Sequence, residues 1–202
     1  MTAMEARRRL LMIGGELPGI YRRVEYLEAN GTQMMQTGIT GLCEFDVVAQ
    51  GVAPIGSTQI LLGRGANGGQ YFGLVGSTGG SALWTLGGGE NFSGVSAFDW
   101  TNIHASFELI NELSSATITI GNASINRKSA YTEIWREYTL FSGSQSYRAN
   151  ARIKSCICYK DGNKVLNFIP CVRKSDNKPG MYDTVTKTFY TNSGTGEFIV
   201  PS

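Results

Sequence analysis

The sequence predicts an all-β protein built as an antiparallel β-sandwich, and three observations support this prediction. Residues 152–160 alternate between apolar and polar side chains with the period of two that is typical of a half-buried strand. Asp161-Gly162 follows at once, and this dipeptide favours a two-residue hairpin turn because such a turn requires positive φ. Earlier in the chain, over residues 51–94, turn signals rich in Gly, Ser and Asn recur about every 10–12 residues between short apolar runs, which is typical of a sandwich.

Residues 2–13 are the exception, because they predict a short helix. Thr2 and Glu5 have the spacing of a capping box, and Gly14-Gly15 ends the helix. A helix of this length is marginal on its own, so we expect it to pack on another surface. It is interpreted as an arm that docks on a neighbouring subunit; the alternatives are a frayed terminus and a helix packed on its own domain. The docking residues of the arm are Arg7, Arg8, Arg9, Leu10, Leu11 and Met12.

Strands are expected wherever apolar or β-branched residues run between turn signals. In the run 42–50 the side chains alternate, with Glu44 and Asp46 on one face and Phe45 and Val47 on the other. The expected strands before the closing region are 21–28, 33–37, 42–50, 59–62, 70–75, 82–86, 100–109, 116–121, 123–125 and 138–142.

The closing region predicts a hairpin followed by two further strands. The first hairpin strand is expected to place Ile153, Ile157 and Tyr159 on one face and Arg152, Lys154 and Lys160 on the other. The return strand is expected at 164–169, where Pro170 ends it or confines it to an edge. A turn at 178–180, a strand at 184–191 and a short last strand at 198–200 complete the prediction.

Two blocks of this sequence resemble a known family. One comprises R-I-K-S-C-I-C-Y (152–159), F-I-P-C (168–171) and G-M-Y-D-T-V-T-K-T-F-Y-T-N-S-G-T-G (180–196). The other is L-P-G-I-Y-R-R-V-E-Y-L-E-A-N-G-T-Q (17–33). Together they are similar to the closing and opening parts of the concanavalin-like (laminin-G-like) sandwich modules that are frequent in bacteriophage and prophage structural proteins.

The resemblance implies a concanavalin-like jelly-roll sandwich over residues 19–202, preceded by an arm and linker over 1–18. It also implies a bacteriophage virion component, such as a capsid decoration, head-fibre or tail protein, assembled in the cytoplasm of the bacterial host. The expected partners are other virion proteins, reached through the arm, further copies of the chain, and glycans of the host surface or of mucus. A purely structural virion module without sugar binding is the alternative.

Composition narrows the possible functions. The formal net charge is only +2, and Arg7 to Arg9 carry no interleaved aromatic residues, so nucleic-acid binding is not expected. Leu10 to Ile13 is far shorter than the roughly 20 apolar residues of a membrane span, so membrane insertion is not expected either.

The four cysteines predict free thiols in a reducing compartment. If Asp161-Gly162 forms a two-residue turn, Cys158 faces Val165 and Cys171 faces Arg152, so the hairpin pairs no two cysteines. Cys156, Cys158 and Cys171 lack the usual zinc-knuckle spacing, so no metal and no other cofactor is expected. Calcium is not expected, because no D-x-D-x-D run is present.

The chain is not expected to be an enzyme. Glu44 and Asp46 share a strand face, but the third acid of the laminarinase-like hydrolase motifs falls on Val48 or Ala49. A glycoside hydrolase is therefore the least favoured alternative, and the two acids are interpreted as part of a polar outer face. His104 is interpreted as an ordinary strand-face histidine, and no serine lies in a G-x-S-x-G elbow.

A carbohydrate site, if present, is expected near the Gly-rich loops, where an aromatic ring could stack on a sugar beside groups that bind hydroxyls. The alternative is that Trp84, Trp100 and Trp135 each fill the core. The predicted carbohydrate-binding residues are Arg64, Asn67, Tyr71, Trp84 and Asn91.

Overall fold

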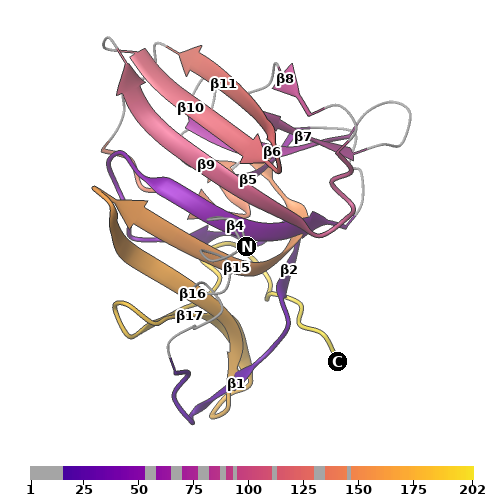
Figure 1. The fold of residues 1–202 in the computed structure, drawn as a ribbon. Coiled ribbons are helices and arrows are strands. Elements are labelled where there is room, and N and C mark those ends of the chain that lie inside the picture. Colours follow the sequence, from indigo (N-terminus) through magenta and orange to yellow (C-terminus); the bar gives the residue numbers. More distant parts are fainter. Residues whose placement is uncertain are drawn as a thin grey trace.

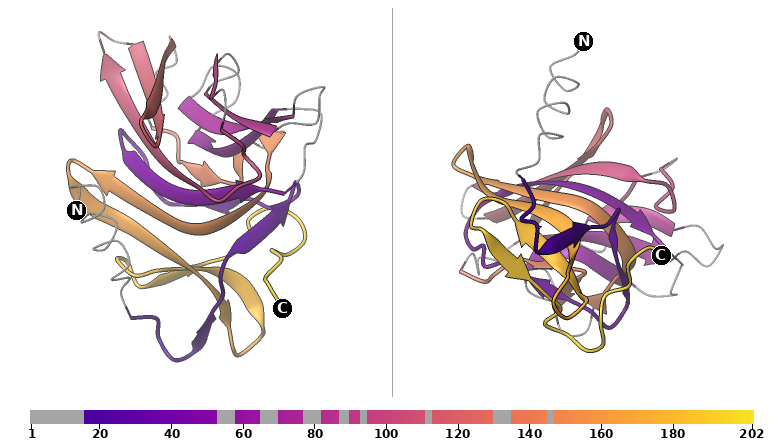
Figure 2. Two further views of the ribbon diagram at one scale, coloured as in Figure 1. Left: turned by 45° about the vertical axis from the view of Figure 1, so that its right-hand side comes forward. Right: turned by 90° about the horizontal axis from the view of Figure 1, so that it is seen from below.

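The computed structural model of the chain describes residues 16–52, 58–64, 70–76, 82–86, 90–92, 95–110, 113–129, 135–144 and 147–202. These residues form two β-sheets that pack as a sandwich, and none of them lies in a helix (Figure 1 and Figure 2). The prediction of an all-β sandwich is therefore confirmed. Residues 1–15, which include the predicted helical arm with Arg7 to Met12, lie outside the described residues, so the arm stays a prediction.

The larger sheet has ten strands, and its main path runs β11-β10-β9-β4-β15-β16-β17-β18. In addition, β1 pairs with β16 and β2 pairs with β15. Its strands are β1 (Tyr21–Arg23), β2 (Leu27–Asn30), β4 (Glu44–Gly51), β9 (Thr101–Ile110), β10 (Leu113–Ile120), β11 (Ala123–Ser129), β15 (Asn150–Lys160), β16 (Asn163–Arg173), β17 (Lys178–Asp183) and β18 (Thr188–Tyr190).

The smaller sheet has eight strands and lies behind the larger one in Figure 1. Its pairings are antiparallel except for one parallel pair between β13 and β5. The strands are β3 (Met35–Gln36), β5 (Thr58–Arg64), β6 (Gln70–Gly76), β7 (Ala82–Leu86), β8 (Glu90–Asn91), β12 (Thr139–Leu140), β13 (Ser142–Ser144) and β14 (Tyr147–Arg148).

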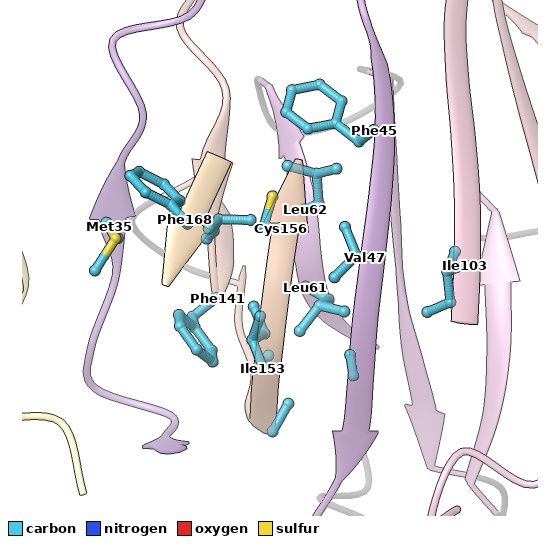
Figure 3. Packing of buried hydrophobic residues seen from close by; sticks show 14 of the residues in the cluster. Met35, Phe45, Val47, Leu61, Leu62, Ile103, Phe141, Ile153, Cys156 and Phe168 are labelled. Atoms are coloured by element: carbon cyan, nitrogen blue, oxygen red, sulfur yellow. The ribbon is translucent and has the colours of Figure 1, made fainter. Parts of the chain in front are cut away.

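The core lies between the two sheets and follows from strand alternation. Phe45, Val47 and Ala49 of β4 are buried, whereas Glu44 and Asp46 lie on the outer face, as the alternation of 42–50 predicts. Residues of both sheets meet in one apolar cluster, as Figure 3 shows for Val47, Ile153, Leu61 and Phe141. The outer face of β4 therefore carries the polar side chains Glu44 and Asp46.

The expected first strand, 21–28, is two strands. β1 pairs with the end of β16, and β2 pairs with the start of β15. The chain crosses from one partner to the other between them, and this crossing places Tyr26 on the route between β1 and β2.

The closing hairpin has the predicted two-residue turn, since Lys160 pairs with Asn163 and both Asp161 and Gly162 have positive φ. However, a bulge between Cys158 and Tyr159 shifts the pairing, so Cys158 faces Leu166 and the prediction of Val165 is wrong. Cys171 faces Gly180 and Arg23, so the prediction that it faces Arg152 is also wrong.

The side chains of β15 do not occupy the predicted faces, because this strand contains a second bulge. It lies between Ile153 and Ser155, opposite β4, and it changes the phase of the alternation. Ile153, Cys156 and Cys158 are therefore buried in the core, whereas Ile157 shares the outer face with Asp46, its partner on β4. Ile153 and Ile157 do not share a face, contrary to the simple period-two pattern.

The end of the chain differs most from prediction. β16 continues through Pro170 to Arg173, because Pro170 still offers its carbonyl to Val24 N and the next residues pair with β1 and β17. The expected turn at 178–180 is strand β17, and the expected strand 184–191 contains a turn and only the short β18. The expected last strand reduces to a bridge between Glu28 and Ile199.

Candidate functional site

Arg64 is one of the predicted carbohydrate-binding residues, but the structure places it in the interior, where its side chain is fully buried. Its Nη1 donates a 2.5 Å hydrogen bond to Gly41 O, and its guanidinium lies 4.8 Å from the ring centre of Tyr138. Tyr138 Oη donates to the same carbonyl, and burial raises the pKa of this phenol far above its ordinary value. Arg64 is therefore a core residue that holds the loop before β4, and its assignment to a surface site is wrong.

The other members of that group are only partly described. Tyr71 of β6 is half-buried and pairs with Gly63. Trp84 pairs with Leu74 and Asn91 pairs with Thr85, which places both on neighbouring strands of the smaller sheet. Asn67 lies outside the described residues. Carbohydrate binding by these four residues stays a prediction.

The outer face of the larger sheet carries a different cluster of polar and aromatic side chains. We call it the outer-face site and define it by Asp46, His104, Trp100, Tyr26 and Lys154. Asp46 and His104 are direct cross-strand neighbours on β4 and β9, and their outward direction follows from the buried residues on either side of each. Asp46 Oδ1 lies 2.8 Å from His104 Nδ1, so the carboxylate fixes the orientation of the imidazole. His104 is thus a strand-face histidine, as the sequence predicts.

Hydroxyl and amide groups extend this face beyond His104. Thr119 of β10 pairs with His104 and hydrogen-bonds Ser124 of β11. Asn126 of β11 donates to both Ser115 and Thr117 at 2.7 Å. These short side chains leave the outer surface of β9 to β11 polar and hydrogen-bonded.

Two aromatic rings form the other end of the outer-face site. Trp100 directly precedes β9, and its ring centre lies 5.9 Å from that of Tyr26 at an interplanar angle of 46°. Both side chains are half-buried. His104 is the fourth residue after Trp100, which corresponds to about 13 Å along an extended strand. The site is therefore an extended one.

Two cations cover the rings. Lys154 Nζ lies 3.9 Å from the ring centre of Trp100, and the Arg152 guanidinium lies 4.8 Å from that of Tyr26. Lys154 is the residue at the β15 bulge, which turns its side chain out of the regular ladder. Such cation–π contacts contribute about 0.5–1 kcal/mol each where solvent reaches them.

Each cation also has a carboxylate partner. Lys154 Nζ lies 2.7 Å from Glu25, which is exposed, and Arg152 Nε donates a 2.6 Å bond to Glu28. The hydrogen bond to Glu28 is the main reason why the pKa of Arg152 is raised above its ordinary value. The aromatic end of the site is therefore close to neutral, although it presents donors and acceptors of both signs.

This arrangement suits a ligand with a hydroxyl-covered ring. A half-exposed indole offers an apolar face, while the ammonium, guanidinium and carboxylate groups beside it can exchange hydrogen bonds with hydroxyls. No three His, Cys, Asp or Glu side chains of the described residues group closely enough to hold a metal ion. Within the same residues, no helix has the length and apolar character of a membrane span.

Sequence reasoning found only part of this site. The sequence places Asp46 and His104 on strand faces and offers the core as the alternative position of Trp100, so it does not predict that the three residues form one site. Tyr26 and Lys154 were missed, because their positions depend on the break between β1 and β2 and on the bulge in β15. Neither the strand break nor the bulge has a sequence signal as strong as the Asp161-Gly162 dipeptide that predicts the hairpin turn.

Comparison with known proteins gives little further information. No family model and no curated protein matches the chain. Among solved structures, scytalido-glutamic peptidase with a transition state analog inhibitor is 14% identical, with a TM-score of 0.40, and the match covers 86% of this chain and 98% of that one. The same peptidase with a peptide based transition state analog is 12% identical, with a TM-score of 0.39, and the match covers 89% and 98%.

This comparison contradicts the prediction that the chain is not an enzyme, because both matched structures are those of an enzyme. The prediction is therefore withdrawn. At these TM-scores the likeness assigns no reaction and no catalytic residue to this chain.

Proposed function

We propose that this chain is a glycan-binding sandwich module of a bacteriophage virion and that the outer-face site is where the glycan binds. The observation that supports the glycan site is the half-buried Trp100 with Tyr26 and Lys154 beside it, on a polar sheet face. The flexible stem of Lys154 allows its ammonium to move from the indole to a sugar hydroxyl. The extended shape of the site fits an oligosaccharide better than a single sugar.

The virion assignment rests on the sequence resemblance over residues 17–200, which also supports a concanavalin-like jelly-roll topology. Under this proposal residues 1–18 dock the module on other virion proteins, further copies of the chain surround it, and the sandwich meets surface or mucus glycans. Production in the bacterial host cytoplasm and release with the virion are part of the same proposal.

A purely structural virion module is the second candidate. It is favoured by the internal pairing of the site, because Lys154 covers Trp100 and is itself paired with Glu25. In that case the cluster stabilises the packing of β2 and β15, and no sugar displaces the cations.

Binding of the full-length chain to immobilised bacterial surface polysaccharides and mucin glycans separates the two candidates. If the chain binds a glycan, the immobilised polysaccharide should retain it, and this retention should be lost after periodate has cleaved the vicinal diols of the glycan. Absence of retention on every glycan, or retention that survives periodate, would favour the structural candidate. The same samples are assayed for new reducing ends, so that turnover of the glycan is measured as well.

A further inference from the structure

The ion pair between Lys154 and Glu25 is the part of the outer-face site that a ligand can most easily open. Lys154 Nζ lies 2.7 Å from Glu25 Oε1, and the two side chains are 31% and 61% exposed. An ion pair at such exposure is weak, because water screens the two charges and both side chains lose rotamer freedom when they pair. The carboxylate of Glu25 can therefore leave the ammonium at little cost.

By contrast, the neighbouring pair of Arg152 and Glu28 is held in place. The side chain of Glu28 is only 13% exposed, and Arg152 Nε donates a 2.6 Å bond to it. Arg152 Nη1 donates a longer bond, of 3.5 Å, to Gln50. The backbone of Glu28 exchanges two hydrogen bonds with that of Ile199, which fixes the strand that carries this carboxylate. Lys154 is therefore the cation that can turn toward a ligand.

We propose that the outer-face site selects glycans whose sugars carry a carboxylate, the uronate class; this inference rests on the glycan-binding function proposed above. A sugar that stacks on the covered face of Trp100 takes the place of the Lys154 ammonium, which lies 3.9 Å from the ring centre. The carboxylate of a uronate projects from the rim of the sugar ring, where it can accept a charge-assisted hydrogen bond from the displaced ammonium. A neutral sugar offers only hydroxyls in exchange.

The other carboxylates of this face do not oppose a uronate at Trp100. Asp46 pairs with His104, which is the fourth residue after Trp100. This spacing corresponds to about 13 Å along an extended strand, and the Debye length at physiological ionic strength is about 8 Å. Glu28 is already paired with Arg152. The carboxylate that competes with the ligand for Lys154 is therefore that of Glu25.

Retention of the full-length chain on immobilised alginate, polygalacturonate and hyaluronan tests this inference. Each polymer is compared with the same polymer after its carboxyl groups have been reduced to primary alcohols, so that the two forms share their sugar rings and linkages but differ in charge. At physiological salt we expect the chain to bind at least one of the uronate polymers roughly tenfold more tightly than its reduced form, because the reduced form gives the ammonium no carboxylate.

Two pairs of variants separate this contact from general attraction to a polyanion. Lys154→Gln should abolish the preference for the uronate form, whereas Lys178→Gln should keep it. Lys178 is the matched control because it forms a 2.8 Å ion pair of similar exposure with Glu197, outside the outer-face site. Glu25→Gln removes the competing carboxylate and should tighten binding of the uronate polymer roughly threefold, whereas Glu197→Gln should leave it unchanged.

Equal retention on a polymer and its reduced form, with Trp100→Ala weakening both, would overturn the selectivity for uronates and leave glycan binding in place. Equal losses in Lys154→Gln and Lys178→Gln would overturn it too, because they would show unspecific attraction between a basic chain and a polyanion. Retention on neutral glycans but on none of the three uronate polymers has the same consequence. Retention on no glycan of either kind would overturn the proposed function together with this inference.

Discussion

Asp183→Ala is expected to lower the free energy of unfolding by roughly 4 kcal/mol, because it leaves buried donors without an acceptor. Asp183 is fully buried at the end of β17. One carboxylate oxygen accepts from Asn167 N at 2.8 Å and Val185 N at 3.0 Å. The other accepts from Thr186 N at 3.1 Å and Thr186 Oγ1 at 2.6 Å.

Chemical denaturation measures this loss as a lower transition midpoint. Asp183→Asn should fall between wild type and alanine, because an amide keeps one acceptor oxygen but turns donors toward Thr186. Asp176→Ala is the matched control; its carboxylate pairs with Arg173 at the surface, so the midpoint should stay close to that of wild type. A midpoint for Asp183→Ala equal to that of Asp176→Ala would show that Asp183 does not hold the turn.

Gly180→Ala is expected to destabilise the chain by roughly 3 kcal/mol through a backbone clash. A Cβ atom at this position would lie 2.2 Å from Tyr190 O and 2.7 Å from the ring of Phe189. Neither neighbour can move freely, because β17 and β18 pair at Met181 and Tyr190, beside the site of the clash. The added methyl group must therefore push the two strands apart.

Hydrogen exchange measures the same change locally. We expect the amides of β17 and β18 to lose protection in Gly180→Ala, with a smaller change in β4 and β9. Gly19→Ala is the control, because a Cβ there would meet no atom within 4 Å. Equal stability of the two glycine variants would contradict the close approach of β17 and β18.

These two residues also show how far the sequence predicts this fold. Gly180 follows Lys178-Pro179, a pattern that favours a turn, but the glycine is needed for close approach to Tyr190 and lies in a strand. Asp183 precedes β-branched residues that favour a strand, yet its carboxylate folds them into a turn. Local strand and turn propensities are therefore overridden, at Gly180 by the packing of β17 against Tyr190 and after Asp183 by the hydrogen bonds that its buried carboxylate accepts.

By contrast, the alternation of β4 and the Asp161-Gly162 turn were predicted correctly, because period-two burial and positive φ are local properties. The site was harder to predict. Arg64 is predicted to bind carbohydrate because it lies beside a Gly-rich loop in the sequence. In the structure it is buried, where it contacts Gly41 O and the ring of Tyr138. Lys154 contacts the ring of Trp100 because of the bulge in β15, and no residue pattern in the sequence predicts that bulge.

Affinity of the Trp100→Ala chain for a retained glycan is the most direct test of the outer-face site. Trp135→Ala is the matched control, because Trp135 is 67% exposed and stacks with Arg136 on the loop before β12. If the outer-face site binds the glycan, Trp100→Ala should bind at least about tenfold more weakly, which corresponds to about 1.4 kcal/mol, while Trp135→Ala binds as wild type. Wild-type affinity in a folded Trp100→Ala chain, or a loss confined to Trp135→Ala, would contradict the assignment of glycan binding to this face.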